Sequence, residues 1–328
     1  MKNKFQFTAV LLITLLAKSG AQQTPLISQY MFNTFLINPA AAGLDGYTAV
    51  NLTAHEQWLG VKDSPKTHIL SGQTRLDGKN FITKLLKLRT DDKSIAGSGK
   101  VGLGVIFYND RNGIIDRTGF QFTYAYHLQM QEAGLSLGIS GSMYQFSVNR
   151  SKIVLNENEQ DDNLVNNSDF TRFIPDFSFG AIYTTKDYYA GLSIMQLMQS
   201  SIQFGNSGAS DAYRLYRQYN IHGGYRYEIN RDYVIEPSGL IKVSKMSRPQ
   251  VDLTTKVYFR NDYWAGLSFR TGSAFVLMGG VSVDQYSFGY AFDYNFNSIG
   301  RKSFGTHEVI ISVKFGERSP KYRWLHKL

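Results

Sequence analysis

The chain has 328 residues, enough for two soluble domains or for one large β domain. It contains no cysteine, which excludes disulfides, thiolate metal sites and cysteine nucleophiles. The formal net charge is +9, but the basic residues are interspersed with acids, so nucleic-acid binding has little support. Tyr and Phe number 21 and 22, an abundance typical of strands and of membrane interfaces.

Residues 1–21 have the three parts of a cleaved export signal. Lys2 and Lys4 precede the apolar run 5–16, and residues 19–21 are small, as signal cleavage requires. The apolar run is too short to cross a bilayer as a helix. We therefore expect cleavage before Gln22.

Residues 22–45 form an N-terminal extension without strand periodicity. The segment carries two prolines and a run of small residues at 40–43, and we expect it to contain a short helical turn. Either it plugs the inner mouth of a barrel, the interpretation that we favour, or it faces the periplasm and contacts another protein. The candidate residues for both roles are Gln29, Tyr30, Asn33, Asn38 and Pro39.

From residue 46 to 315 the sequence predicts about fourteen strands, on the basis of period-2 alternation and turn signals. Most reach the length of about ten residues that a tilted strand needs to cross a bilayer. The predicted ranges are 47–57, 67–76, 100–110, 115–130, 134–149, 174–184, 188–197, 214–229, 233–243, 250–260, 263–271, 274–283, 286–296 and 306–315.

The two faces of these strands differ in polarity. In 250–260, apolar residues such as Leu253 and Val257 alternate with polar ones such as Asp252 and Lys256. The alternation slips near residues 143 and 144, which predicts a bulge or the end of the membrane band. Membrane-length alternating strands behind an export signal predict an all-β, antiparallel transmembrane barrel of the outer membrane.

The connections sort by length. Residues 131–133, 185–187, 230–232, 261–262 and 284–285 are tight, whereas 150–173, 198–213 and 297–305 are long and polar and fall on the other side. Bacterial barrels have short periplasmic turns and longer outer loops. We therefore expect both termini in the periplasm, including a disordered basic tail at 316–328.

The connection 77–99 breaks this rule because it is long although it falls on the side of the tight turns. Its apolar residues, including Leu85, lie near helical spacing among basic residues such as Lys87. An amphipathic helix here either covers the inner rim or forms a docking surface for a periplasmic partner.

Several motifs along the mature chain resemble the PorP/SprF family of type IX secretion system membrane proteins. The most specific are the N-terminal group and the closing Gly-Thr-His-Glu. The motifs lie at residues 29–33, 37–40, 42–43, 57–60, 65–67, 102–104, 109–113, 124–126, 175–180, 189–193, 237–242, 266–270, 289–293 and 305–308. One departure is at His55 and Glu56, where the family pattern leads us to expect Arg before Gln57 and Trp58, so a role for a positive charge there is not carried over.

The resemblance implies an outer-membrane barrel that works with the type IX export apparatus. Its expected partners are outer-membrane lipid, other type IX components and a secreted adhesin-like substrate. Gln57 and Trp58 join the candidate contact residues. In the acidic loop 150–173, Glu159, Asp161 and Asp162 mark either a solvated loop or a contact for the secreted partner.

The residues give little support to catalysis or to metal binding. His307 and Glu308 are adjacent on a strand, so they face opposite ways and cannot act on one substrate atom. Residues 109–113 lack the alternating acids of a calcium loop and are better explained as a polar hairpin tip, with Gly113 at positive φ.

We thus expect a non-enzymatic scaffold for type IX secretion, without cofactor or metal. The alternatives are a passive porin or hydrophobic-ligand transport channel and, third, a membrane hydrolase of the lipase type.

Overall fold

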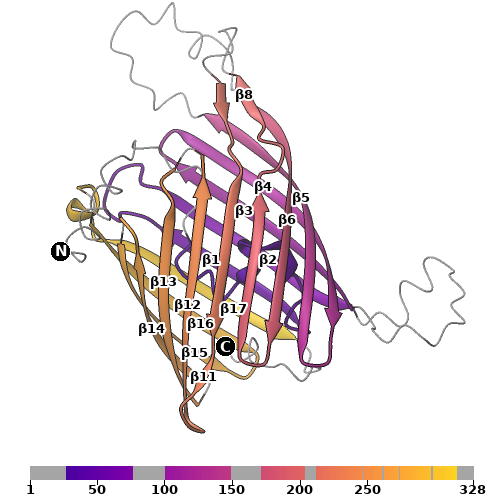
Figure 1. Ribbon diagram of the computed structural model, residues 1–328. Coiled ribbons are helices and arrows are strands. Elements are labelled where there is room, and N and C mark those ends of the chain that lie inside the picture. Colours follow the sequence, from indigo (N-terminus) through magenta and orange to yellow (C-terminus); the bar gives the residue numbers. More distant parts are fainter. Residues whose placement is uncertain are drawn as a thin grey trace, which may run out of the picture.

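The computed structural model describes residues 27–76, 100–148, 171–203, 212–245, 247–260, 262–272, 274–296 and 298–315. In this part of the chain the strands form a closed antiparallel barrel of 14 strands (Figure 1). The strand bounds are β1 Thr48–Glu56, β2 Lys66–Leu76, β3 Lys100–Asn112, β4 Ile115–Gln129, β5 Ala133–Val148, β6 Thr171–Thr185, β7 Tyr188–Met195, β8 Ser201–Gln203, β9 Ala212–Arg214, β10 Gln218–Tyr225, β11 Tyr227–Glu228, β12 Tyr233–Ser244, β13 Gln250–Phe259, β14 Tyr263–Arg270, β15 Ala274–Val283, β16 Tyr286–Asn295 and β17 Thr306–Phe315.

Two pairings close the ring. β1 pairs with β2 on one side and with β17 on the other, with Thr48 opposite Phe315. β10 joins β7 to β12. The predicted all-β barrel of about fourteen strands is confirmed.

The predicted strand 214–229 is wrong in its extent. β9 pairs with β8 in a separate two-stranded sheet, and only β10 and β11 belong to the wall. β10 and β11 are interrupted only at Arg226, and both keep one register with β12, with Gly224 opposite Ser238 and Tyr227 opposite Ile235. The alternation is in fact interrupted at Tyr216 and Arg217, between β9 and β10, since Leu215 is buried whereas Tyr219, at the same parity, is exposed. The prediction extended the strand across this interruption.

The outer face of the barrel is apolar and the inner face is polar. On β13, Leu253 is 58% exposed, whereas Asp252 and Lys256 are buried inside the ring. On β4, Phe120 and Phe122 likewise point outward. A large exposed apolar band of this kind is stable only where lipid covers it.

The slip near Met143 and Tyr144 predicted a bulge or the end of the membrane band, and the first of these alternatives is wrong, since β5 has no bulge there. Both residues keep an unbroken register with β4 and β6, with Met143 outward and Tyr144 inward. The polarity pattern slips because the inward Tyr144 and Phe146 pack on Ile174 and Leu215. In this part of β5 the inward side chains are aromatic and fill the lumen. Nearer the start of the strand the inward side chains are polar.

The two ends of the barrel differ. The connections 130–132, 186–187, 229–232, 260–262 and 284–285 lie at what we call the short-turn end. The connection 57–65 and the described residues 196–203, 212–217, 296 and 298–305 lie at the long-loop end. The tight turn of β3 and β4 lies there too, and Gly113 in it has φ 62°, as predicted. Within the described residues, no helix is long and apolar enough to cross a bilayer.

Candidate functional site in the barrel lumen

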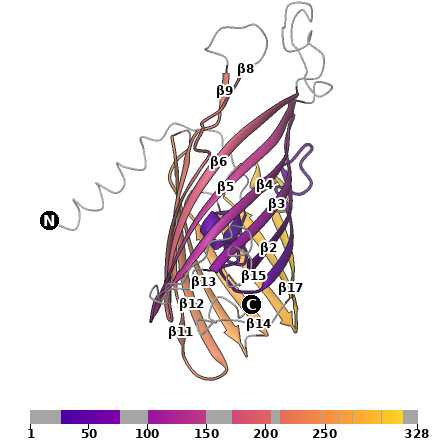
Figure 2. The same cartoon turned by 90° about the vertical axis from the view of Figure 1, so that its right-hand side faces the viewer.

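Residues 27–47 lie inside the barrel and form no separate domain. Figure 2 shows this segment in indigo, enclosed by the strands. It contains two single-turn 3-10 helices, η1 (Thr34–Leu36) and η2 (Pro39–Ala41). Asn38 caps η2, because its side-chain oxygen accepts from the N–H of Ala40 at 2.9 Å, and Pro39 starts the turn with its fixed φ.

A buried carboxylate holds the start of the segment. The two side-chain oxygens of Glu308 accept from the backbone N–H groups of Ser28 and Gln29 at 2.7 and 2.8 Å. His55 Nδ1 lies 2.8 Å from the same carboxylate, and the amide of Gln57 lies 3.3 Å from His55 Nε2. Hydrogen bonds to a charged acceptor are the strong kind, so the peptide is fixed at this point.

A second charged group stands beside the first. The guanidinium of Arg270 contacts Asp252 at 3.3 Å and Asp293 at 3.0 Å, and it donates to the hydroxyl of Ser28 at 3.2 Å. That hydroxyl in turn donates to Asp293 at 2.6 Å. The three charged side chains are buried, so each needs its partners, and Ser28 completes the set.

Uncharged side chains hold the middle of the segment. Asn33 donates to the hydroxyl of Ser71 at 2.8 Å. The amide nitrogen of Asn38 donates to the carbonyls of Ala181 and Leu192 at 3.1 and 3.0 Å and lies 3.0 Å from His222 Nε2. Three strands, β6, β7 and β10, thus meet on this one amide.

Wall side chains hold the end of the segment through contacts with its backbone. His127 Nε2 lies 2.9 Å from the carbonyl of Ala42, and the N–H of Gly43 donates to Gln73 at 3.1 Å. Arg75 donates to the carbonyl of Gly43 at 2.8 Å and also to that of Leu44. The buried backbone carbonyls of Ala42, Gly43 and Leu44 lie outside helices and strands, and wall side chains supply their hydrogen-bond partners.

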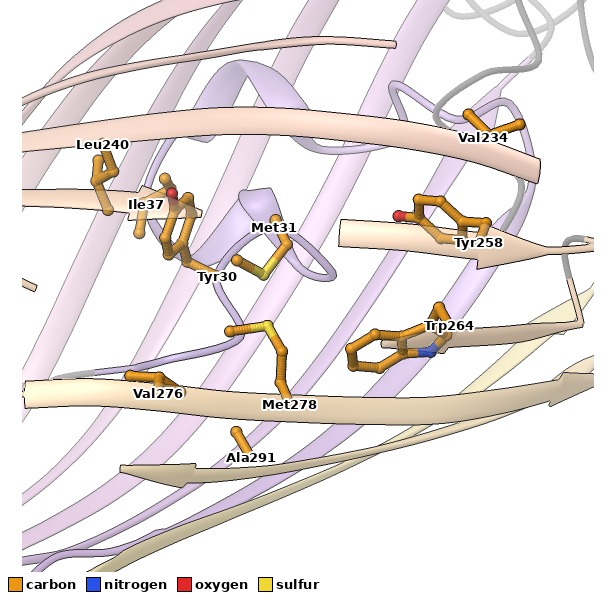
Figure 3. Close-up of a cluster of buried hydrophobic side chains, with 10 residues drawn as sticks. All are labelled: Tyr30, Met31, Ile37, Val234, Leu240, Tyr258, Trp264, Val276, Met278 and Ala291. Carbon is orange, nitrogen blue, oxygen red and sulfur yellow. The ribbon is translucent and has the colours of Figure 1, made fainter. Parts of the chain in front are cut away.

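Apolar side chains of the segment fill much of the space between these contacts. Figure 3 shows Tyr30, Met31 and Ile37 surrounded by wall residues, among them Leu240 and Trp264. On the other side of the segment, Phe35 packs against the wall in a second apolar cluster. Burying a side chain of this size contributes about 1.5–3 kcal/mol, so several of them add substantially to the polar contacts.

A strip of small residues makes room for η2. The residues share one level of the wall and are direct neighbours across β3 to β7. They are Gly102, Ala125, Gly138, Gly180 and Ser193. A Cβ built on Gly138 would lie 2.6 Å from the carbonyl oxygen of Pro39, and one on Gly102 or Gly180 would overlap Ala42 or Asn38. We call these five positions the small-residue strip.

Among the residues that the structure describes, cavities remain beside the segment towards both ends of the barrel. The larger, about 160 Å³, lies towards the long-loop end and is lined by Ile27, Tyr144, Asp176, Leu215 and Lys242, among others. The smaller, about 50 Å³, lies towards the short-turn end, near Asp45 and Lys314.

The structure brings together five of the residues singled out in the sequence. Gln29, Tyr30, Asn33, Asn38 and Pro39 are all buried in the lumen. Gln57 and Trp58 lie at the long-loop rim, where Trp58 N–H donates to Thr306 at 3.2 Å, and only Gln57 connects to the lumen contacts, through His55. Five further candidates lie outside the described residues: Leu85, Lys87, Glu159, Asp161 and Asp162.

Sequence reasoning missed the wall residues that hold the segment. His55, Arg270, Asp293 and Glu308 fall on inward positions, and charge at an inward position was the available signal. His55 lies where the sequence departs from the family pattern, and there it contacts the carboxylate of Glu308. Glu308 is the last residue of the closing motif, so the motif and the N-terminal group are in direct contact.

The predicted separation of His307 and Glu308 is confirmed. His307 lies on the outer face, 2.6 Å from the hydroxyl of Tyr290, whereas Glu308 points into the lumen.

At the hairpin tip, Asp110 accepts from Thr67 at 2.7 Å and pairs with Arg117. The lumen groups thus bind a peptide segment through paired and hydrogen-bonded contacts.

The closed barrel with its apolar outer face defines a membrane protein with the fold of an outer-membrane β-barrel. The chain matches the family described as type IX secretion system membrane protein PorP/SprF over residues 19–313, and it belongs to this family. A comparison with curated proteins gives no match.

Solved structures of similar shape include a FadL homologue from Pseudomonas aeruginosa and the translocator domain of the autotransporter NalP from Neisseria meningitidis. The first has a TM-score of 0.45 at 10% identity and covers 90% of this chain and 95% of that one. The second has a TM-score of 0.43 at 9% identity and covers 88% of this chain and 96% of that one.

Proposed function

We propose that this protein is a non-enzymatic scaffold of type IX secretion whose lumen is plugged by residues 27–47. The supporting observation is the set of buried contacts that Glu308, Asn38 and Arg75 make along the segment. A permanently open pore would not need a peptide segment that is bonded to the wall at the start, middle and end of that segment. In this proposal the long-loop side contacts a secreted adhesin-like partner, and the short-turn side contacts other type IX components.

The alternative is a passive porin or a channel for hydrophobic ligands. Planar-bilayer recording separates the two functions. The wild-type protein should give no stable conductance, whereas a variant lacking residues 27–44 should conduct ions, since a ring of fourteen strands encloses more space than its own side chains fill. Steady wild-type conductance would refute the plug.

The partner contact is tested at the acidic loop. The triple variant Glu159→Lys, Asp161→Lys, Asp162→Lys is compared with a triple variant of equal charge change at the short-turn end, Glu132→Lys, Asp187→Lys, Asp262→Lys. The tagged proteins are purified from the native envelope, and the proteins recovered with them are quantified. We expect the first variant alone to lose a secreted partner. Equal recovery with both variants would remove the acidic loop from the proposal.

The short-turn side is tested by deleting residues 79–92, which include Leu85 and Lys87. We expect the barrel to assemble and a periplasmic component to be lost from the purified complex. If the barrel assembles and every partner is retained, the docking role of this connection is wrong, and covering the inner rim is its better explanation.

A further inference from the structure

The larger cavity in the lumen carries a carboxylate oxygen without a partner. Asp176 on β6 is buried and lines this cavity. Its Oδ1 accepts from the backbone N–H groups of Phe177 and Met198 at 2.7 and 3.1 Å, whereas its Oδ2 has no hydrogen-bond partner in the described part of the chain. The nearby Arg217 does not supply one, and its Nε donates to the carbonyl of Leu197 instead. A buried acceptor that is left unpaired is costly, so a bound donor would be stabilised here.

A lysine stands at another side of the same cavity. Lys242 on β12 is buried and also lines the cavity. Asp252, the acid diagonally across from it on β13, is paired with Arg270. Within the described residues the ammonium group of Lys242 forms no ion pair. Buried charges are normally paired, so the cavity presents one anionic and one cationic group to a ligand.

The register of the wall gives the separation of these two groups. Lys242 is opposite Asn220 on β10. Asn220 is opposite Ser193 on β7, and Ser193 is opposite Gly180 on β6, the fourth residue after Asp176. The two backbones are therefore about 14 Å apart around the wall and about 13 Å apart along the strands. Both side chains point into the curved ring and that of lysine is long, so the charged ends approach each other to roughly 10 Å.

The rest of the cavity lining is of mixed polarity. Apolar side chains such as Ile37, Ile106 and Leu215 alternate with amides and hydroxyls such as those of Gln121 and Ser178. The volume of about 160 Å³ is roughly ten times the space that holds one water molecule. A purely apolar ligand would leave the charged and amide groups of this lining without partners.

We propose that this cavity binds a short peptide with free ends, its ammonium group on Asp176 and its carboxylate on Lys242. An extended chain reaches about 3.3–3.6 Å per residue, so a tripeptide, about 10 Å long, spans the gap between the two groups. The amides of the peptide pair with polar lining groups, and small apolar side chains pack on Ile106 and Leu215. This binding site goes beyond the scaffold role and does not depend on which partner the loops contact.

The end groups of the ligand are varied first, on the unaltered protein. Trialanine, N-acetyl-trialanine and trialanine amide are titrated into the purified full chain in detergent, and binding is measured by isothermal titration calorimetry. Octanoate tests for a site that takes an apolar chain. We expect saturable binding of trialanine and about tenfold weaker binding of each blocked peptide, because each loses a hydrogen bond to a charged group. Absence of trialanine binding, equal binding of the blocked peptides or tighter binding of octanoate would overturn the proposal.

Variants then assign the two ends of the ligand. Asp176→Asn keeps the oxygen that accepts from the two backbone N–H groups, and Lys242→Met keeps the length of the stem. The controls are Asp187→Asn and Lys245→Met, at exposed positions. We expect Asp176→Asn to bind trialanine and its N-acetyl form equally, Lys242→Met to bind trialanine and its amide equally, and the controls to retain both preferences. If both preferences persist in the lumen variants, the peptide binds elsewhere and the proposal is overturned. Should a lumen variant fail to assemble, the ligand series on the unaltered protein still decides.

Discussion

The small-residue strip offers a sharp test of how the lumen segment and the wall fit together. In Gly138→Ala, the new methyl group would lie 2.6 Å from the carbonyl oxygen of Pro39 and also close to the backbone of Ala40. Ordinary van der Waals separation is about 3.5 Å, so η2 must move by about 1 Å. Gly141 on the same strand faces outward, and a methyl group there would lie 3.6 Å from the ring of Phe177, an ordinary contact.

We expect Gly138→Ala to lower the free energy of unfolding by about 2 kcal/mol, the usual cost of overpacking a rigid site. Gly141→Ala should change it by less than about 0.5 kcal/mol. Both proteins are unfolded with urea in phospholipid vesicles and followed by tryptophan fluorescence, since the ring of Trp264 lies 4.1 Å from that of Phe32 in the segment.

A double-mutant comparison isolates the contact. In a protein that lacks residues 27–44, the cost of Gly138→Ala should disappear, because the group that the methyl meets is gone. The explanation fails if the two glycine variants are equally stable in the full chain. It also fails if Gly138→Ala costs the same with and without the segment.

Three further predictions concern single side chains. Glu308→Ala removes two charge-assisted hydrogen bonds and should lower the free energy of unfolding in urea by about 3 kcal/mol. The control His307→Ala, on the outer face, should lower it by less than about 1 kcal/mol. Similar losses of stability in the two variants would contradict the role of the carboxylate. Burial raises the pKa of Asp45 from 3.8 to about 6, although Lys314 and Arg75 act in the opposite direction. The folded protein then binds this proton more tightly than the unfolded chain, so the stability of the wild type relative to Asp45→Asn should rise as the pH falls from about 6 to 4; a flat difference would show that the carboxyl is not perturbed. Leu253→Arg places a charge on the lipid face and should cost about 2–4 kcal/mol in vesicles if it lies near the bilayer midplane, and a neutral effect would place this position outside the membrane.

The wall of this protein could be predicted from the sequence because strand periodicity is local. Side chains two residues apart share a face, so alternation such as that of Leu253 and Asp252 reveals both the strand and its two environments. Turn residues then divide the strands and sort the connections by length. The prediction was wrong at residues 214–229, where β9 pairs outside the ring and residues 215–217 belong to no strand.

The lumen contacts could be decided only by the tertiary structure. Ser28 and Glu308 are 280 residues apart, and only closure of the ring between β1 and β17 brings the first and last motifs together. The glycines of the small-residue strip likewise look like ordinary strand glycines in the sequence, and their purpose depends on which segment passes in front of them. The sequence determines which residues point inward because that depends on neighbours along the chain. What they meet there depends on how the whole sheet closes.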